Sequence, residues 1–140
     1  MKKISVVYAT MTKHSRKIAD AVAGALGVTA LNVADSPKIG QIDLLFIVGG
    51  LYSGESMPEL LEAVSGLKGA DVKSAALITS SVSDKRGQDG VRARLKDAGI
   101  PVADEYRCFG SFLFFKLGRP NKADVQGAVD FASRLAAKEA

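Results

Sequence analysis

The sequence predicts an α/β fold, in which helices cover both faces of an open parallel sheet of five strands. Short apolar segments alternate along the chain with segments whose apolar residues recur at helical spacing. The segment 44–48 is almost continuously apolar, as in a strand that is covered on both faces. Strands that alternate with helices are joined by right-handed crossovers, so the expected sheet is doubly wound. The five strands are expected at residues 4–8, 28–33, 44–49, 74–80 and 105–109, the last with the weakest pattern.

Four helices are expected, and most of them have a recognisable start or stop signal. The first, at residues 15–26, is recognised by its apolar spacing alone. The second begins at a capping box of Ser56 and Glu59, with Pro58 in its first turn. Two further signals are a glycine at position 99, which ends the third helix, and an asparagine at position 121, a favourable N-cap that starts the last.

The composition restricts the class of protein. The chain has 140 residues, of which 47% are apolar and 24% charged, so one domain spanning residues 1–140 can bury a core. A single cysteine, Cys108, excludes an intramolecular disulfide framework and a multi-cysteine metal site, and we expect it to be a buried, inert thiol. No apolar run has the length of a membrane span or a signal peptide, so a cytoplasmic protein without an integral membrane segment is expected.

The chain is basic, with a formal net charge of +4 at pH 7. Its lysines and arginines are interspersed along the predicted helices, which is typical of solvated helix faces. No nucleic-acid recognition motif accompanies them, so nucleic-acid binding is not expected. The positive charge is compatible with one anion site and with an acidic protein partner.

In an open parallel sheet, ligands bind beyond the carboxyl ends of the strands, where the strand order reverses. Three predicted loops lie there, at residues 9–15, 49–56 and 80–87. The first contains the hydroxyls of Thr10, Thr12 and Ser15 and opens into a helix. Hydroxyls and free N–H groups at a helix N-terminus suit a phosphate, although the same side chains can also cap the helix.

The other two loops suit a flat heterocycle. The second contains three glycines, which let the backbone approach a ring closely, and Tyr52, which can stack on that ring or anchor the loop. The third is rich in serines that can bond the polar edge of a heterocycle, unless it is a solvated turn.

These loops resemble those of the short-chain flavodoxins, and the resemblance covers essentially the whole chain. The phosphate loop of that family reads Ser/Thr-x-Thr-Gly-Asn-Thr, and residues 10–15, Thr-Met-Thr-Lys-His-Ser, stand in its place. Lys13 and His14 replace the family's Gly-Asn, and Lys13 supplies a positive charge instead. The resemblance implies a strand order of 2-1-3-4-5, FMN as the cofactor, and electron transfer between redox partner proteins.

The resemblance implies cofactor-binding residues but no catalytic or metal-binding ones. The residues expected to hold FMN are Thr10, Met11, Thr12, Lys13, His14, Ser15, Gly50, Leu51, Tyr52, Ser53, Gly54, Ser80, Ser81, Val82 and Ser83. A second hypothesis is an FMN-dependent reductase or oxidase that acts on a quinone or tetrapyrrole. It is favoured by the Phe-Leu-Phe-Phe segment at 112–115, which can line a substrate pocket unless it packs beneath its own loop.

Overall fold

A computed structural model describes residues 3–9, 14–52, 55–81, 87–109 and 120–138. The strands are β1 (Ile4–Ala9), β2 (Ala30–Asn32), β3 (Leu44–Tyr52), β4 (Glu55–Ser56), β5 (Ala75–Ser81) and β6 (Val102–Phe109). The helices are α1 (His14–Leu26), the short 3-10 helix η1 (Val33–Asp35), α2 (Pro58–Ser65), α3 (Asp89–Asp97) and α4 (Lys122–Lys138). Strands and helices therefore alternate as the sequence predicts.

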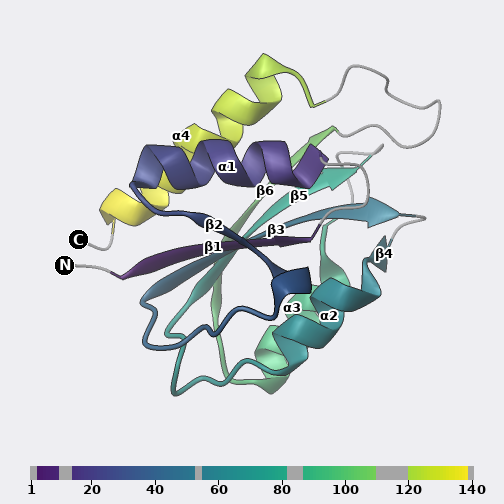
Figure 1. Cartoon of the computed structure of the whole chain (residues 1–140), viewed down its shortest axis with the longest axis vertical. Helices are drawn as coiled ribbons and strands as arrows, with labels where there is room; N and C mark the ends of the chain where they lie inside the picture. The colour runs from purple at the N-terminus through teal and green to yellow at the C-terminus, as the bar shows by residue number, and fades with distance from the viewer. Residues whose placement is uncertain (1–2, 10–13, 53–54, 82–86, 110–119, 139–140) are drawn as a thin grey trace.

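The parallel strands lie in the order β2-β1-β3-β5-β6 (Figure 1), which is the predicted order 2-1-3-4-5 when β4 is left out of the numbering. Ala9, the last residue of β1, lies beside Gly49 of β3. The next residue of β3, Gly50, lies beside Ser80 of β5. The carboxyl ends of these three strands therefore meet at one edge of the sheet. The strand order reverses between β1 and β3, so this edge contains the switch point of the fold.

Helices α1 and α4 cover one face of the sheet, and α2 and α3 cover the other (Figure 1). Alternate side chains of each strand point to opposite faces, so each strand contributes to two apolar clusters. The cluster under α1 and α4 includes Val6, Phe46, Ile78, Ile18, Val22 and Phe131. The cluster under α2 and α3 includes Val7, Ile47, Leu77, Leu60, Val91 and Leu95. This double coverage explains why the first five residues of β3 are continuously apolar in sequence.

Several strand boundaries differ from the prediction. β2 ends at Asn32, because the Asn32 side chain accepts a hydrogen bond of 2.9 Å from the amide of Ala34 and turns the chain into η1. β3 runs through Gly49 and Gly50 to Tyr52, since both glycines pair with β5 and the last two residues of β3 pair with β4. β6 begins at residue 102 instead of 105, and its early part contains a register shift that hides its period in the sequence.

The capping box expected at Ser56 and Glu59 is wrong. Ser56 lies in β4, which pairs antiparallel with the end of β3 and places Ser56 opposite Leu51. The N-cap of α2 is Met57, which has an extended backbone and makes no side-chain cap hydrogen bond. Pro58 does occupy the first turn, as expected.

The start predicted for the last helix is confirmed. The Asn121 side chain accepts a hydrogen bond of 3.0 Å from the amide of Asp124, and the Asp124 carboxylate accepts one of 2.8 Å from the amide of Asn121. Gly99 follows α3 with a φ of 77°, as a helix-ending glycine should. Cys108 is buried in β6, as expected. None of the helices in the described ranges has the length and apolar character of a transmembrane segment.

Candidate functional site

The candidate site lies at the carboxyl ends of β1, β3 and β5, next to the start of α1. The residues Ala9, Gly49 and Thr79 lie side by side here, one from each strand. Three connections leave the sheet at this edge, which is where open parallel sheets bind their ligands. The strands that precede the three predicted loops therefore end at one common edge of the sheet.

Ser15 is the strongest sign of an anion site. It lies in the first turn of α1 and is only 1% exposed, and its Oγ has no hydrogen-bond partner within the described residues. The interpretation that Ser15 merely caps the helix is therefore not supported. The first turn of α1, which the structure describes in full, also contains no acidic side chain to neutralise the positive end of the helix dipole. A buried hydroxyl without a partner costs about 1–3 kcal/mol, and a ligand oxygen would remove that cost.

His14 lies beside it as the first residue of α1 and is partly buried. The other members of the predicted phosphate loop, Thr10, Met11, Thr12 and Lys13, lie outside the described residues. Their expected contacts with a phosphate stay predictions.

The glycine-rich segment is part of β3 and not of a loop. Gly50 and Leu51 are both buried, and Gly50 pairs with Ser80 of the neighbouring strand. Tyr52 ends β3 with its Cα opposite Glu55 of β4. The Tyr52 side chain, like Ser53 and Gly54, lies outside the described residues, so ring stacking by Tyr52 stays a prediction.

The serines expected to contact a heterocycle form the end of β5. Ser80 and Ser81 are 5% and 6% exposed and pair with Cys108 and Phe109 of β6. They lie in a strand, so the alternative of a solvated turn is wrong for these two residues. Val82 and Ser83, together with the aromatic segment 112–115, lie outside the described residues.

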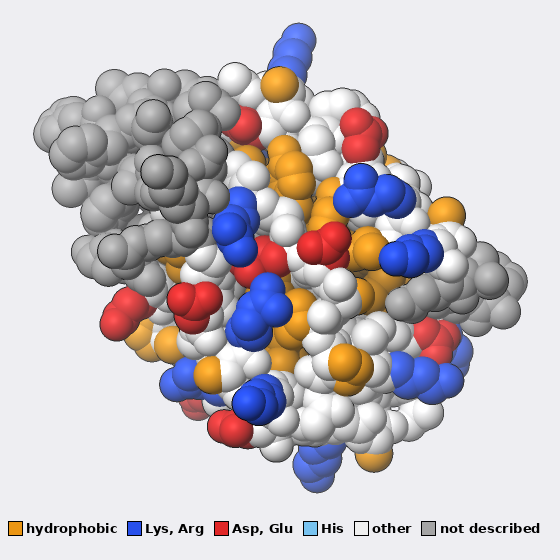
Figure 2. Space-filling model, turned by 180° about the vertical axis from the view of Figure 1, so that it is seen from behind, with side chains coloured by type: hydrophobic (Ala, Val, Ile, Leu, Met, Phe, Trp, Pro, Cys, Tyr) orange, Lys and Arg blue, Asp and Glu red, His pale blue; other side chains and the backbone are white. Residues whose placement is uncertain are grey.

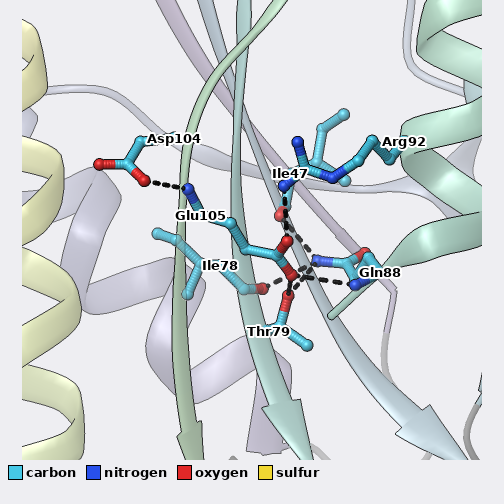
Figure 3. A network of polar contacts seen from close by, with 7 residues as sticks. All are labelled: Ile47, Ile78, Thr79, Gln88, Arg92, Asp104 and Glu105. Carbon is cyan, nitrogen blue, oxygen red and sulfur yellow. Dashed lines mark hydrogen bonds and ion pairs between the residues drawn. The ribbon is translucent and has the colours of Figure 1, made fainter. Parts of the chain in front are cut away.

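A buried polar network behind this edge was not predicted (Figure 3). Its centre is Glu105 of β6, whose side chain is 3% exposed. One carboxylate oxygen accepts hydrogen bonds from the Thr79 hydroxyl at 2.6 Å and from the main-chain amide of Gln88 at 2.9 Å. The other oxygen accepts one from the Arg92 guanidinium at 2.7 Å. Glu105 thus connects β5, β6 and the start of α3.

Gln88, the N-cap of α3, is the second part of this network. It is fully buried, and its side-chain nitrogen donates to the carbonyl of Ile78 and to the Thr79 hydroxyl, both at 3.1 Å. A longer bond of 3.4 Å reaches the carbonyl of Ile47 in β3. These acceptors fix the orientation of the amide. Its oxygen Oε1 then has no hydrogen-bond partner in the part of the chain that the structure describes.

Burial alone would raise the pKa of Glu105, because water no longer solvates the carboxylate. The hydrogen bonds from Thr79, Arg92 and the Gln88 amide outweigh that effect and hold the pKa of Glu105 below its ordinary value. Glu105 is therefore ionised at neutral pH, and the network contains a buried negative charge with a half-exposed arginine as its partner.

The sequence does contain one signal for this network. Gly87 immediately precedes Gln88, and a methyl group at position 87 would lie 2.6 Å from a carboxylate oxygen of Glu105. The glycine at 87 therefore allows the carboxylate to approach the chain closely. The partners of Glu105 are distant in sequence, so the role of this glycine can be recognised only when the strand order is known.

A cavity of about 500 Å³ lies elsewhere, between η1 and α2. It is lined by Val33, Ile39 and Leu67 together with Glu59 and Glu62. Its lining contains none of the residues expected to bind a cofactor. The chemistry of the carboxyl edge therefore identifies the candidate site better than cavity size does.

The charges agree with the sequence analysis. On the face opposite to that of Figure 1, Lys and Arg side chains are interspersed with acidic ones and with exposed apolar side chains (Figure 2). The part of this face that the structure describes therefore has no uniformly basic surface of the kind that binds nucleic acid.

Comparison with known proteins gives the class of fold. No protein-family model matches the sequence, and no curated protein matches it. A short-chain flavodoxin associated with a bacterial microcompartment is similar in structure, with a TM-score of 0.70 and 22% identity over 100% of both chains. The Trp repressor binding protein of Bacillus subtilis has a TM-score of 0.60 and 13% identity over 94% of this chain and 98% of its own.

The chain also resembles one part of a larger enzyme. Rubredoxin oxygen:oxidoreductase from Desulfovibrio gigas has a TM-score of 0.68 and 17% identity over 100% of this chain, which spans 37% of the length of that enzyme. At these identities the likeness shows the fold. The chain has a flavodoxin-like fold, as its sequence predicts.

Proposed function

We propose that the chain binds FMN at the carboxyl edge of the sheet and transfers electrons between redox partner proteins. The observation that carries this proposal is Ser15, whose buried hydroxyl has no partner among the described residues and lies in the first turn of α1, beside the switch point. Such a position suits a phosphate ester, because the helix supplies free N–H groups and the positive end of its dipole.

The other residues at this edge fit the ring of the same cofactor. Gly50, Leu51 and Tyr52 supply main chain from the end of β3, and Ser80 and Ser81 supply polar groups from the end of β5. Residues 10–14 complete the proposed phosphate site, and residues 53–54 and 82–83 the proposed ring site. FMN supplies the redox chemistry when bound, and the chain binds and orients it.

The partner is proposed from charge. A chain with a net charge of +4 is attracted to an acidic surface, so we propose an acidic redox partner. Association of this kind weakens as the salt concentration rises.

The test compares FMN with riboflavin, which contains the same ring but no phosphate. The purified protein should retain FMN after desalting and bind it more tightly than riboflavin. In a Ser15→Ala variant, FMN should bind about tenfold more weakly, as expected for the loss of one hydrogen bond to a charged group, while riboflavin binding stays unchanged. Ser65→Ala is the matched control, since Ser65 is exposed on α2 and bonds its own helix. A protein that retains neither flavin would contradict the proposal.

The alternative, a reductase or oxidase, is favoured by the aromatic segment at 112–115. Steady-state turnover separates the two functions. A carrier exchanges electrons with proteins and shows no saturable turnover of a quinone or a tetrapyrrole, whereas an enzyme does.

A further inference from the structure

The network around Glu105 joins β6, the end of β5 and the start of α3 (Figure 3). Thr79 immediately precedes Ser80 and Ser81, the serines that end β5. Gln88 is the residue from which α3 begins, and Glu105 bonds both Thr79 and the Gln88 main chain through a single carboxylate oxygen. This oxygen therefore connects the end of β5 to the start of α3, in addition to the direct bonds from the Gln88 side chain to Ile78 and Thr79.

Stability alone is a poor explanation for this arrangement. The surrounding cluster on this face is apolar, and Leu77 precedes Thr79 by two residues on the same side of β5. Replacing a buried charged group by apolar side chains is often neutral or stabilising, because the carboxylate of Glu105 loses its hydration on burial. A buried carboxylate bonded by directional donors does fix geometry, which apolar contacts do less well.

The network also extends beneath β3. The Gln88 side chain reaches the carbonyl of Ile47, two residues before Gly49, and fills the space beside that glycine. A shift of Glu105 would therefore be transmitted through Gln88 to the end of β3 and through Thr79 to the end of β5. These are the two strand ends from which the proposed ring site is built.

We propose that Glu105 is a positioning residue for the ring of the cofactor. Through Thr79 and Gln88 it holds the ends of β3 and β5 and the start of α3 in one geometry, so that Gly50 and Ser80 present their polar groups to the ring. This inference rests on the proposed function. Glu105 acts through its neighbours and contacts no ligand itself.

The experiment measures FMN and riboflavin dissociation from folded, saturated protein. In Glu105→Gln, one carboxylate oxygen is replaced by an NH2 group, which cannot accept a hydrogen bond. This group would face either the Arg92 guanidinium or the donors of Thr79 and Gln88, so the hydrogen bonds on that side are lost. Thr79→Val removes the hydroxyl that bonds both Glu105 and Gln88. It leaves the charge of Glu105 unchanged, and valine has the same β-branched shape as threonine. Glu62→Gln is the matched control, because it makes the same chemical change at an exposed position.

Both network variants should release FMN and riboflavin about tenfold faster than the unchanged protein, a factor that corresponds to the loss of one such hydrogen bond. They should also alter the visible absorption bands of the bound flavin at saturation, which a mere change in folding stability would leave alone. The control should show neither effect. If Glu105→Gln does not fold, Thr79→Val carries the test.

Two results would contradict the proposal in different ways. Network variants with a lower unfolding temperature, but with unchanged flavin dissociation and unchanged bands, would give Glu105 a purely structural role and leave the proposed function intact. An unchanged protein that binds neither FMN nor riboflavin would overturn the proposed function, and with it the positioning role.

Discussion

The side-chain amide of Gln88 occupies the space that a side chain at Gly49 would need. A methyl group at position 49 would lie 2.9 Å from Oε1 of Gln88 and 2.7 Å from Cδ2 of Leu60. The Gln88 amide cannot rotate away without losing its hydrogen bond to the carbonyl of Ile78. The glycine at 49 is therefore required by the packing of α2 and α3 beneath β3, apart from any contact with a ligand.

Gly49→Ala should lower the free energy of unfolding by about 1–3 kcal/mol, the usual cost of overpacking a core. Urea unfolding followed by circular dichroism measures this. Gly24→Ala is the matched control, because Gly24 lies exposed on α1 with nothing within 4 Å of an added methyl group. That control should gain about 0.5–1 kcal/mol from better helix propensity. Equal stability of the two variants would contradict this account of Gly49.

Gly127 of α4 likewise leaves space for a neighbouring side chain, that of Tyr106. The Tyr106 hydroxyl donates a hydrogen bond of 3.1 Å to the carbonyl of Asp124 in α4, and a methyl group at 127 would overlap that hydroxyl. Gly127→Ala should therefore destabilise the protein, although alanine is better than glycine in a helix by about 1 kcal/mol.

A double-mutant cycle with Tyr106→Phe checks the cause. Removing the hydroxyl gives the new methyl group more room, so Gly127→Ala should cost less in the Tyr106→Phe background by at least about 1 kcal/mol. Additive effects of the two substitutions would show that the clash with the hydroxyl is not the reason.

The fold was predictable because its determinants are local. Apolar runs, helical spacing and cap residues such as Asn121 operate over a few neighbours, and the rule for parallel crossovers then leaves few topologies. The errors have non-local causes. Ser56 looks like an N-cap in sequence, but its position opposite Leu51 in β4 depends on a hairpin with the end of β3.

The candidate site was predictable in position but only partly in its residues. Ser15, Gly50 and Ser80 lie at the expected edge because strand ends and helix starts can be recognised in sequence. Thr79, Gln88 and Glu105 were missed because their chemistry arises from contacts between strands that are distant in the chain. An isolated glutamate in the weakest predicted strand looks solvent-exposed until β5 and α3 are placed beside it.

The capping pair of α4 gives a further prediction. Asn121→Ala removes the side chain that accepts from the amide of Asp124 and should lower the free energy of unfolding by about 1 kcal/mol. Gln126→Ala serves as the control within the same helix, because the bond from Gln126 to Asp130 is exposed and worth about 0.2–0.5 kcal/mol. Chemical denaturation of both variants compares the two losses, and a larger loss in the control would contradict the cap.

The last prediction concerns pH. The folded-state pKa of Glu105 is lowered from its ordinary value of 4.5, since the bonds from Thr79, Arg92 and Gln88 outweigh the effect of burial. A group whose pKa is lowered by folding stabilises the folded state above its unfolded pKa, and that stabilisation is lost as the pH falls through the folded pKa. The stability of the protein should therefore decline below about pH 5 as protons bind to the unfolded carboxyl first.

Urea unfolding at several pH values between about 7 and 3 measures this decline in the unchanged protein and in Glu105→Gln. Asp43, whose pKa is also lowered by bonds from the Lys3 amide and Lys73, titrates alike in both and cancels in the difference. The difference in unfolding free energy should thus be largest at neutral pH and shrink as the pH falls. A difference that stays constant with pH would mean that the charge of Glu105 contributes nothing to the network, and that its shape alone holds β5, β6 and α3 together.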